Sequence, residues 1–157
     1  MSEYNLIEGK SQLDDAKITV VASRFNSFIV DHLLDACLGT LKKSGLHDKN
    51  ITVVRVPGAF EIPSTVQQVI KHTACDAVIT LGAVIRGETP HFEYICSECS
   101  RGLGQISIAN DLPVIFGVLT VDNTEQAMDR AGTEESNKGA ESAQAAIEMV
   151  NIFRALR

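Results

Sequence analysis

The sequence has few aromatic residues, no tryptophan and no run of basic residues. Phe, Tyr and Trp together make up 5% of the 157 residues, and the formal net charge is −6 at pH 7. A nucleic-acid-binding surface needs a basic face against the phosphate backbone. The acidic balance therefore argues against nucleic acid as the main partner, although one or two well-placed cations would be enough to bind a small anion.

Signals for membranes and secretion are missing as well. The first residues, MSEYNLIEGK, contain no basic segment followed by an apolar stretch. No apolar run approaches the roughly 20 residues that a membrane-spanning helix needs. We therefore expect a cytoplasmic location and no membrane partner. In that reducing compartment the four cysteines should be free thiols.

Two of these cysteines, Cys96 and Cys99, have the C-x-x-C spacing of metal and redox sites. A zinc site would require a second pair or nearby histidines, but the other two cysteines are single and distant. A thioredoxin-like pair begins a helix, whereas this pair lies inside a predicted one. A structural role is therefore favoured for both residues.

Apolar runs and helical patterns alternate four times along the chain. Strands are predicted at 17–22, 51–56, 77–85 and 114–120, and helices at 27–44, 63–72, 92–110, 124–131 and 137–154. The strands are apolar almost throughout, which indicates that helices cover both faces of the sheet. The pattern predicts a single α/β domain over residues 1–157, a flavodoxin-like three-layer sandwich with a four-stranded parallel sheet flanked by helices.

In such folds ligands bind beyond the carboxyl ends of the strands. Four segments should therefore line one rim, namely SRFN, PGAFE, GAVIRGETPH and GVLTVDN. Phe25 in the first segment either packs onto the following helix or offers its ring to a planar ligand. Glu61 in the second is either a helix-start carboxylate or an acceptor for ligand hydroxyls.

The third segment has the G-x-x-x-x-G spacing of a phosphate loop, from Gly82 to Gly87, but Glu88 stands where the loop needs lysine. No G-x-G-x-x-G follows the first strand either. Thr89 and Pro90 indicate a helix start whose amides would hold an anion. His91 in that turn is a candidate acid–base group.

Cationic residues near the rim have plain structural interpretations too. Arg86 is expected to pair with a nearby carboxylate, and Arg130 to offset the carboxyl end of a helix. Lys138 is predicted to lie in the turn before the last helix. Arg130 or Lys138 would complete a phosphate site if the fold or a neighbouring subunit brings it to the rim.

The assembled segments resemble the 6,7-dimethyl-8-ribityllumazine synthase family over almost the whole chain. The motifs that carry the resemblance appear in the family's order and spacing: SRFN, VPGAFEIP, DAVITLGAVIRGETPHFEY, PVIFGVLT, EQAMDRAG and NKGAE. The implied reaction condenses 5-amino-6-(D-ribitylamino)uracil with 3,4-dihydroxy-2-butanone 4-phosphate, in the penultimate step of riboflavin biosynthesis. No metal or organic cofactor is implied.

The resemblance also implies roles for individual residues. His91 matches the proton donor and acceptor, and Phe25 matches the aromatic residue that stacks on the pyrimidine. The remaining matches are substrate-binding positions: Ala59, Phe60, Glu61, Ala83, Val84, Ile85, Glu88, Thr89, Phe116 and Arg130. The resemblance implies that Phe116 and Arg130 come from an adjacent subunit. It leaves the role of Lys138 open.

Members of the family form pentamers, and in many of them twelve pentamers close into an icosahedral shell. The turn AGTEESNKG has no insertion and so resembles the shell-forming members, and the N-terminal LIEG resembles an added strand on a neighbour's sheet. Three departures stand out. Glu134 replaces a frequent lysine, which weakens the positive field beside Arg130. Pro90 replaces a small or hydroxyl residue, and Arg55 stands where some relatives carry tryptophan.

Three alternatives to this enzyme remain open at the level of sequence. They are a flavodoxin-like binding or signalling domain without catalysis, a paralogue that dismutates lumazine as riboflavin synthase does, and a structural shell that has lost activity. A binding domain has no reason to place His91 and Arg130 as they stand here.

Overall fold

The computed structural model describes residues 3–157, apart from the side chain of Glu134. Four parallel strands form one sheet in the order β2-β1-β3-β4, with bounds β1 Ile18–Ser23, β2 Ile51–Val56, β3 Ala77–Ile85 and β4 Val114–Val121. The helices are α1 Ser27–Lys43, α2 Ile62–His72, α3 His91–Asn110, α4 Thr124–Arg130 and α5 Lys138–Leu156, with short 3-10 turns η1 Asp48–Asn50, η2 Ala59–Glu61 and η3 Glu134–Ser136. The predicted fold class is confirmed, and the predicted bounds differ from the observed ones by at most two residues.

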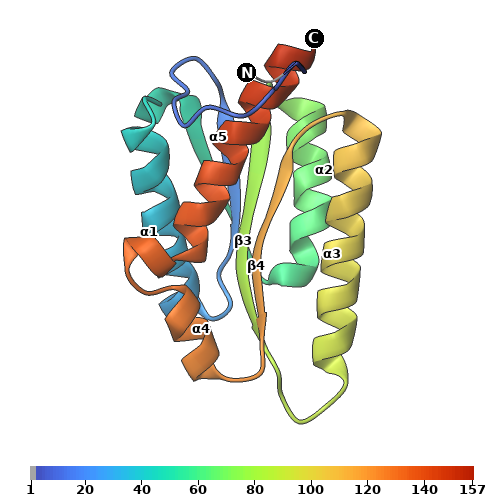
Figure 1. Cartoon of the computed structure of the whole chain (residues 1–157). Helices are drawn as coiled ribbons and strands as arrows, with labels where there is room; N and C mark the ends of the chain where they lie inside the picture. The colour runs from blue at the N-terminus through green and yellow to red at the C-terminus, as the bar shows by residue number, and fades with distance from the viewer. Residues whose placement is uncertain (1–2) are drawn as a thin grey trace.

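Helices cover both faces of the sheet, as Figure 1 shows. One face carries α1 and α5, with α4 at its lower end, and the other carries α2 and α3. Alternate residues of β1 enter opposite cores: Val20 packs in the core beneath α1 and α5, and Val21 in the core beneath α2 and α3. This period of two is the pleat of a strand buried on both faces.

The two edge strands are less covered than the sequence pattern predicted. The central strand β1 is buried throughout, whereas β2 exposes Thr52, Val53 and Arg55 and β4 exposes Phe116 and Thr120. The expectation of full coverage failed because an edge strand has a neighbour on one side only. Apolar side chains are therefore open to solvent at both edges of the sheet.

Part of the NKGAE segment is explained by packing alone. Asn137, which is 1% exposed, caps α5 by accepting hydrogen bonds from the backbone N–H of Gly139 at 2.7 Å and of Ala140 at 3.3 Å. A Cβ on Gly139 would lie 1.9 Å from the carbonyl oxygen of Leu33 in α1. Only glycine permits this approach of α5 to α1. Lys138 is the first residue of α5 and not, as predicted, part of the preceding turn.

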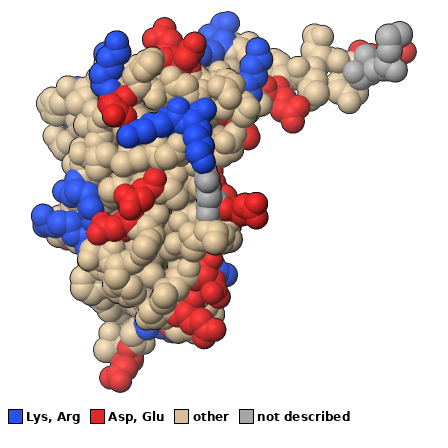
Figure 2. Space-filling model, turned by 90° about the vertical axis from the view of Figure 1, so that its left-hand side faces the viewer, with Lys and Arg blue, Asp and Glu red and all other residues tan. Residues whose placement is uncertain are grey.

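The surface carries mixed charge. In Figure 2 the Lys and Arg side chains lie among Asp and Glu side chains, and no basic face is visible from that side. The same view shows the N-terminal arm projecting from the body, where Tyr4 and Leu6 are both exposed. Over the described part of the chain, no helix combines the length and the apolar character that crossing a bilayer requires.

Candidate active site

A cavity of about 550 Å³ is lined by the segments that follow β1, β2 and β3. The carboxyl ends of these strands lie at the lower end of the sheet in Figure 1. We call this cavity the rim cavity. Its volume falls within the roughly 300–1,000 Å³ typical of small-molecule sites. The described residues that line it come from three strand ends and from α3: Phe25, Asn26, Pro57, Gly58, Ala59, Phe60, Glu61, Ala83, Val84, Ile85, Gly87, Thr89, His91, Phe92 and Ile95.

The segment after β1 holds Phe25 away from the core. The ring is 72% exposed and lines the cavity, so it does not pack onto α1 as one interpretation of the sequence proposed. Backbone N–H groups of Arg24 and Phe25 donate to the carbonyls of Val56 and Pro57 at 2.7 and 3.0 Å. These bonds fix the loop to the end of β2 and leave the ring face available to a planar ligand.

Asn26 is a site residue that sequence reasoning missed. It occupies the left-handed region, with φ 61°, and its Nδ2 donates to the carbonyl oxygen of Ala83 at 2.8 Å. The bond joins the loop after β1 to the end of β3, so Asn26 holds two walls of the cavity together. Asparagine tolerates this backbone conformation better than most residues, and that preference was the available signal.

The segment after β2 forms the second wall. Ala59 is buried in η2, whereas Phe60 and Glu61 are exposed and turn toward the cavity. Glu61 also occupies the N-cap position of α2, where its backbone carbonyl accepts a hydrogen bond from the Thr65 hydroxyl at 2.9 Å. The helix-start interpretation and the ligand-acceptor interpretation of Glu61 are therefore compatible.

The segment after β3 contributes the third wall. Ala83, Val84 and Ile85 line the cavity from the strand, and Thr89 and His91 line it from the turn that follows. Glu88, a predicted binding residue, is exposed and is not among the lining residues. The turn places His91, the one described histidine that lines the cavity, at the first position of α3.

The expected N-cap of α3 is wrong, and the glycine spacing before it has a different cause. Thr89 is not the N-cap of α3; Pro90 is, without a side-chain cap bond, and the Thr89 hydroxyl only accepts from the His91 N–H at 3.4 Å. The glycine spacing also has a packing cause. Gly82 lies inside β3, where a Cβ would stand 2.9 Å from the Ser23 Oγ, so it belongs to no phosphate loop.

Phe92 and Ile95 line the cavity from α3 and were also missed. They lie three residues apart and begin the apolar stripe of α3 that continues through Cys99, Leu103 and Ile106 to the buried core. That periodicity was readable from the sequence. What it could not reveal is that the first turn of the stripe extends beyond the core into a cavity.

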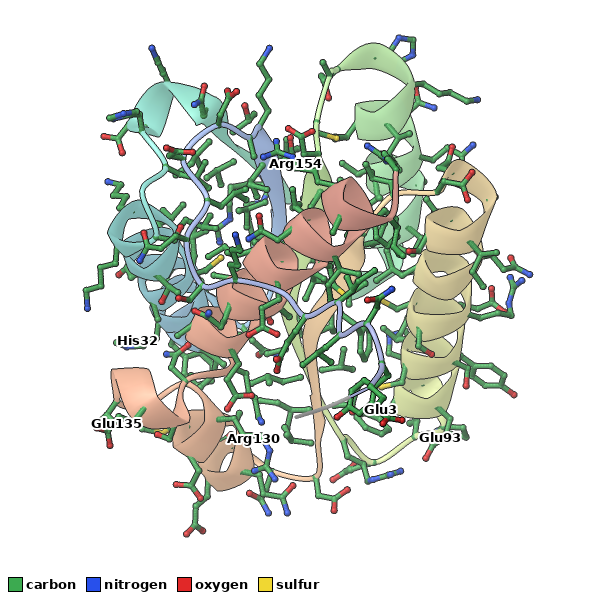
Figure 3. All side chains as sticks on the ribbon, turned by 45° about the horizontal axis from the view of Figure 1, so that its top comes forward. Glu3, His32, Glu93, Arg130, Glu135 and Arg154 are labelled. Carbon is green, nitrogen blue, oxygen red and sulfur yellow. The ribbon has the colours of Figure 1, made fainter. Side chains whose placement is uncertain are left out.

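The remaining predicted residues lie elsewhere in the same chain. A second cavity of about 420 Å³, here called the β4 cavity, is lined by β4, α4 and α5, and it contains Phe116, Arg130 and Lys138. Figure 3 shows Arg130 on α4 and Glu93 in the first turn of α3 on opposite sides of the lower end of β4. One chain therefore does not bring Phe116 and Arg130 to the rim cavity.

Charges in the β4 cavity are partly satisfied within the chain. Arg130 lies in the last turn of α4, where a cation offsets the helix dipole, and its Nη1 donates to the carbonyl oxygen of Gln126 at 3.0 Å. Lys138 pairs with Glu141 at 2.8 Å, and both side chains are about half exposed. The Glu134 side chain, expected to weaken the positive field here, lies outside the described residues.

The cysteine pair lies within α3, as predicted. Burial raises the pKa of the Cys99 thiol to about 11, and burial is also the main cause that raises the pKa of Cys96. A raised pKa leaves little of the thiolate that metals and disulfides require. Across residues 3–157 no group of three or more His, Cys, Asp or Glu side chains is placed to hold a metal ion.

One family model matches nearly the whole chain. The model of the family described as 6,7-dimethyl-8-ribityllumazine synthase matches residues 15–154. The chain therefore belongs to this family, and the resemblance drawn from its motifs is confirmed. Membership assigns the protein to an enzyme family of riboflavin biosynthesis.

Proposed function

We propose that this member of the lumazine synthase family condenses 5-amino-6-(D-ribitylamino)uracil with 3,4-dihydroxy-2-butanone 4-phosphate. The products are 6,7-dimethyl-8-ribityllumazine, phosphate and water. The observation that carries the proposal is that the rim cavity gathers Phe25, the 59–61 segment, the end of β3 and His91 from distant parts of a matching chain.

The walls of the rim cavity suit the pyrimidine substrate. The exposed ring of Phe25 would stack on the planar heterocycle, as loop aromatics do in ligand sites. Ala83, Val84 and Ile85 would contact the edge of the heterocycle, and Ala59 and Phe60 the start of its ribityl chain. Glu61 would accept hydrogen bonds from the ribityl hydroxyls.

The chemistry asks little of the protein beyond orientation and proton transfer. The pyrimidine amine attacks the ketone carbonyl to form an imine with loss of water, and elimination of phosphate leaves an enol that tautomerises to a carbonyl. The ribitylamino nitrogen attacks that carbonyl and closes the second ring with loss of a second water. His91 would donate and accept the protons of these steps, a role for which histidine is suited near neutral pH. Holding two substrates in register can itself remove several kcal/mol of barrier.

The phosphate needs cations that the rim cavity does not provide. Its described lining residues include no Lys or Arg, whereas the β4 cavity contains Arg130 and Lys138. We infer that Arg130 and Phe116 of one copy face the rim cavity of the next, with Glu88 and Thr89 on the other side of the phosphate. The exposed edge strands and the N-terminal arm supply apolar surface for such contacts.

A cyclic homo-oligomer fits this arrangement because each copy would present its β4 cavity to one neighbour and its rim cavity to the other. Such a head-to-tail contact closes into a ring when the rotation permits. We propose a pentamer, alone or as part of a shell of twelve pentamers. Sedimentation or native mass measurement would distinguish the pentamer from the shell. A fully active monomer would contradict both.

The activity is tested by incubating the protein with both substrates and following lumazine formation by absorbance or fluorescence. We expect a rate well above the spontaneous condensation. If the rate does not exceed that background, the proposed function is wrong. Lumazine consumption with riboflavin formation, in the absence of both substrates, would instead support the riboflavin synthase alternative.

A further inference from the structure

We propose that Arg86 is a positioning residue of the rim cavity, which sets the turn that bears Thr89 and His91 without touching the substrate. Arg86 is absent from the residues that line the cavity. It acts through a cluster of Arg86, Phe92, Glu93 and Asp122, here called the Arg86 clamp. The inference rests on the proposed function for its catalytic consequence, although the clamp itself is a matter of geometry.

Three elements meet in the clamp. Arg86 follows β3 and donates from Nε to the Asp122 carboxylate, after β4, at 3.0 Å. Its Nη1 donates to the carboxylate of Glu93 in the first turn of α3. The guanidinium also lies over the ring of Phe92, 4.3 Å from the ring centroid. One side chain thus joins the ends of β3 and β4 to the start of the helix that bears His91.

The clamp encloses the turn between β3 and α3. Residues 87–90 run from the anchored Arg86 to the anchored first turn of α3, and two of them, Gly87 and Thr89, line the cavity. Little else holds this turn. A Cβ added at Gly87 would meet no atom within 4 Å beyond those of its chain neighbours, and Pro90 caps α3 without a side-chain bond. Two backbone bonds mark its ends, Arg86 N–H to Val121 O at 2.9 Å and Glu93 N–H to Pro90 O at 3.0 Å.

Phe92 connects the clamp to the rim cavity. One of its faces is under the guanidinium of Arg86, and the residue also lines the rim cavity beside His91. Because a planar cation above an aromatic face fixes the ring on that side, a shift of Arg86 would move Phe92. His91 is the residue before Phe92 on the same helical turn, so its imidazole would move with it.

A direct phosphate-binding role for Arg86 fits the structure less well. Its single positive charge faces two carboxylates, those of Glu93 and Asp122, so the ion cluster has a net charge of −1. The hydrogen bonds that Arg86 donates to Asp122 and Glu93 raise the pKa of Arg86, and the bond that Glu93 accepts from Arg86 lowers the pKa of Glu93. Both partners therefore stay charged at neutral pH and keep the guanidinium engaged.

Nor is the clamp placed to contribute much to global stability. All three charged side chains are about half exposed, and exposed ion pairs contribute little because water and salt screen them. A positioning role therefore predicts a large effect on catalysis beside a small effect on thermal stability. A merely structural role predicts that the two decline together.

The test compares the wild-type protein with Arg86→Ala, Arg86→Lys and Glu93→Gln. The matched control is Arg101→Ala, which breaks the Arg101–Glu98 pair on the outer surface of the same helix, away from either cavity. Steady-state kcat and KM for each substrate are measured together with Tm. Amide hydrogen exchange is followed for peptides that cover residues 86–95 and, as an internal reference, for peptides from α5.

We expect Arg86→Ala to lower kcat/KM by about 10- to 100-fold, since misplacement of catalytic groups by about 1 Å has effects of that order. The loss should fall on kcat and on the KM of the phosphate-bearing substrate. Exchange should become faster for residues 86–95 and stay unchanged in α5. Arg86→Lys keeps the charge but loses the planar fork, so it should rescue only a small part of the activity.

Glu93→Gln separates positioning from direct phosphate binding. Positioning predicts that it impairs catalysis as Arg86→Ala does, and that the double variant is little worse than either single variant, because both break one clamp. Phosphate binding by Arg86 predicts the opposite, a lower KM for the phosphate-bearing substrate once the competing carboxylate charge is removed. A lower KM for the phosphate-bearing substrate in Glu93→Gln would overturn the inference.

Other outcomes are equally decisive. If the wild-type protein is active and Arg86→Ala matches it in kcat and KM, the inference is wrong while the proposed function stands. If activity falls but exchange of residues 86–95 does not change, Arg86 does not act through the turn. If the wild-type protein forms no lumazine, the proposed function fails, and the exchange comparison still decides whether Arg86 orders the turn.

Discussion

The rim cavity and the β4 cavity adjoin neighbouring strands of one sheet but differ in chemistry. The rim cavity has aromatic rings, a histidine and a carboxylate, with no Lys or Arg among its described residues. The β4 cavity has Arg130 and Lys138 beside the half-exposed ring of Phe116. The first suits a planar heterocycle with hydroxyls and the second suits an anion. The proposed reaction between a heterocycle and a phosphate ester needs both, which is why we propose a site shared between copies.

The largest effect is expected from removing Arg130, one of the two cations that line the β4 cavity. Arg130→Ala should raise the KM of the phosphate-bearing substrate by about 10- to 100-fold, because a charged hydrogen-bond partner contributes about 1.5–3 kcal/mol. The KM of the pyrimidine substrate should change little. Steady-state kinetics with each substrate varied in turn measure this. Arg157→Ala removes the same charge from the exposed end of the chain and serves as the control.

An unchanged KM for the phosphate-bearing substrate in Arg130→Ala would remove this residue from the phosphate site. The β4 cavity would then have no assigned role, and the contrast between the two cavities would lose its functional meaning.

A smaller effect is expected from His91 in the rim cavity. His91→Ala should lower kcat by about tenfold, less than the usual acid–base contribution of about 10²- to 10⁴-fold, because orientation of the two substrates survives. Both KM values should stay close to those of the wild-type protein. The control is His72→Ala, an exposed histidine at the end of α2. Turnover equal to that of the wild-type protein would show that His91 transfers no proton in the slow step.

The smallest effect concerns the pH dependence of the Arg86 clamp. Arg86 lowers the pKa of Glu93 in the folded protein, so Glu93 contributes stability above its unfolded pKa of about 4.3. That contribution is lost as the pH falls through the lower, folded value. The Tm difference between the wild-type protein and Glu93→Gln should therefore be constant from pH 7 to about 5 and disappear in more acidic solution.

Thermal melts across that pH range measure the difference. A Tm difference that does not depend on pH would show that the carboxylate charge of Glu93 does not support the clamp. The expected difference is small because the pair is about half exposed.

Much of the fold followed from periodicity in the sequence. The buried strands β1 and β3 are continuous apolar runs, and Gly45 ends α1 in the left-handed region with φ 116°, as a glycine at that position predicts. The exposure of β2 and β4 did not follow, because an apolar edge strand and an apolar central strand look alike in sequence. Strand order is set by pairing between distant segments.

The site was predictable where it follows from strand ends and less so where it depends on turns. Phe25, Glu61 and His91 line the rim cavity as expected from parallel strands that end at one edge. The cap of α3 was misassigned because Thr89 and Pro90 are both common at helix starts, and the backbone decides between them. Asn26 depends on a left-handed conformation that bonds to Ala83, a contact between residues far apart in sequence.

The central claim, that the rim cavity of one copy is completed by the β4 cavity of the next, is tested most directly by mixing variants. Chains with Phe25→Ala and His91→Ala together are dissociated and reassembled with an equal amount of Arg130→Ala chains. In a head-to-tail ring, about a quarter of the interfaces then pair two intact halves. The mixture should form lumazine at low phosphate-substrate concentration faster than the average of the two parent proteins. A mixture no more active than that average would contradict the shared site.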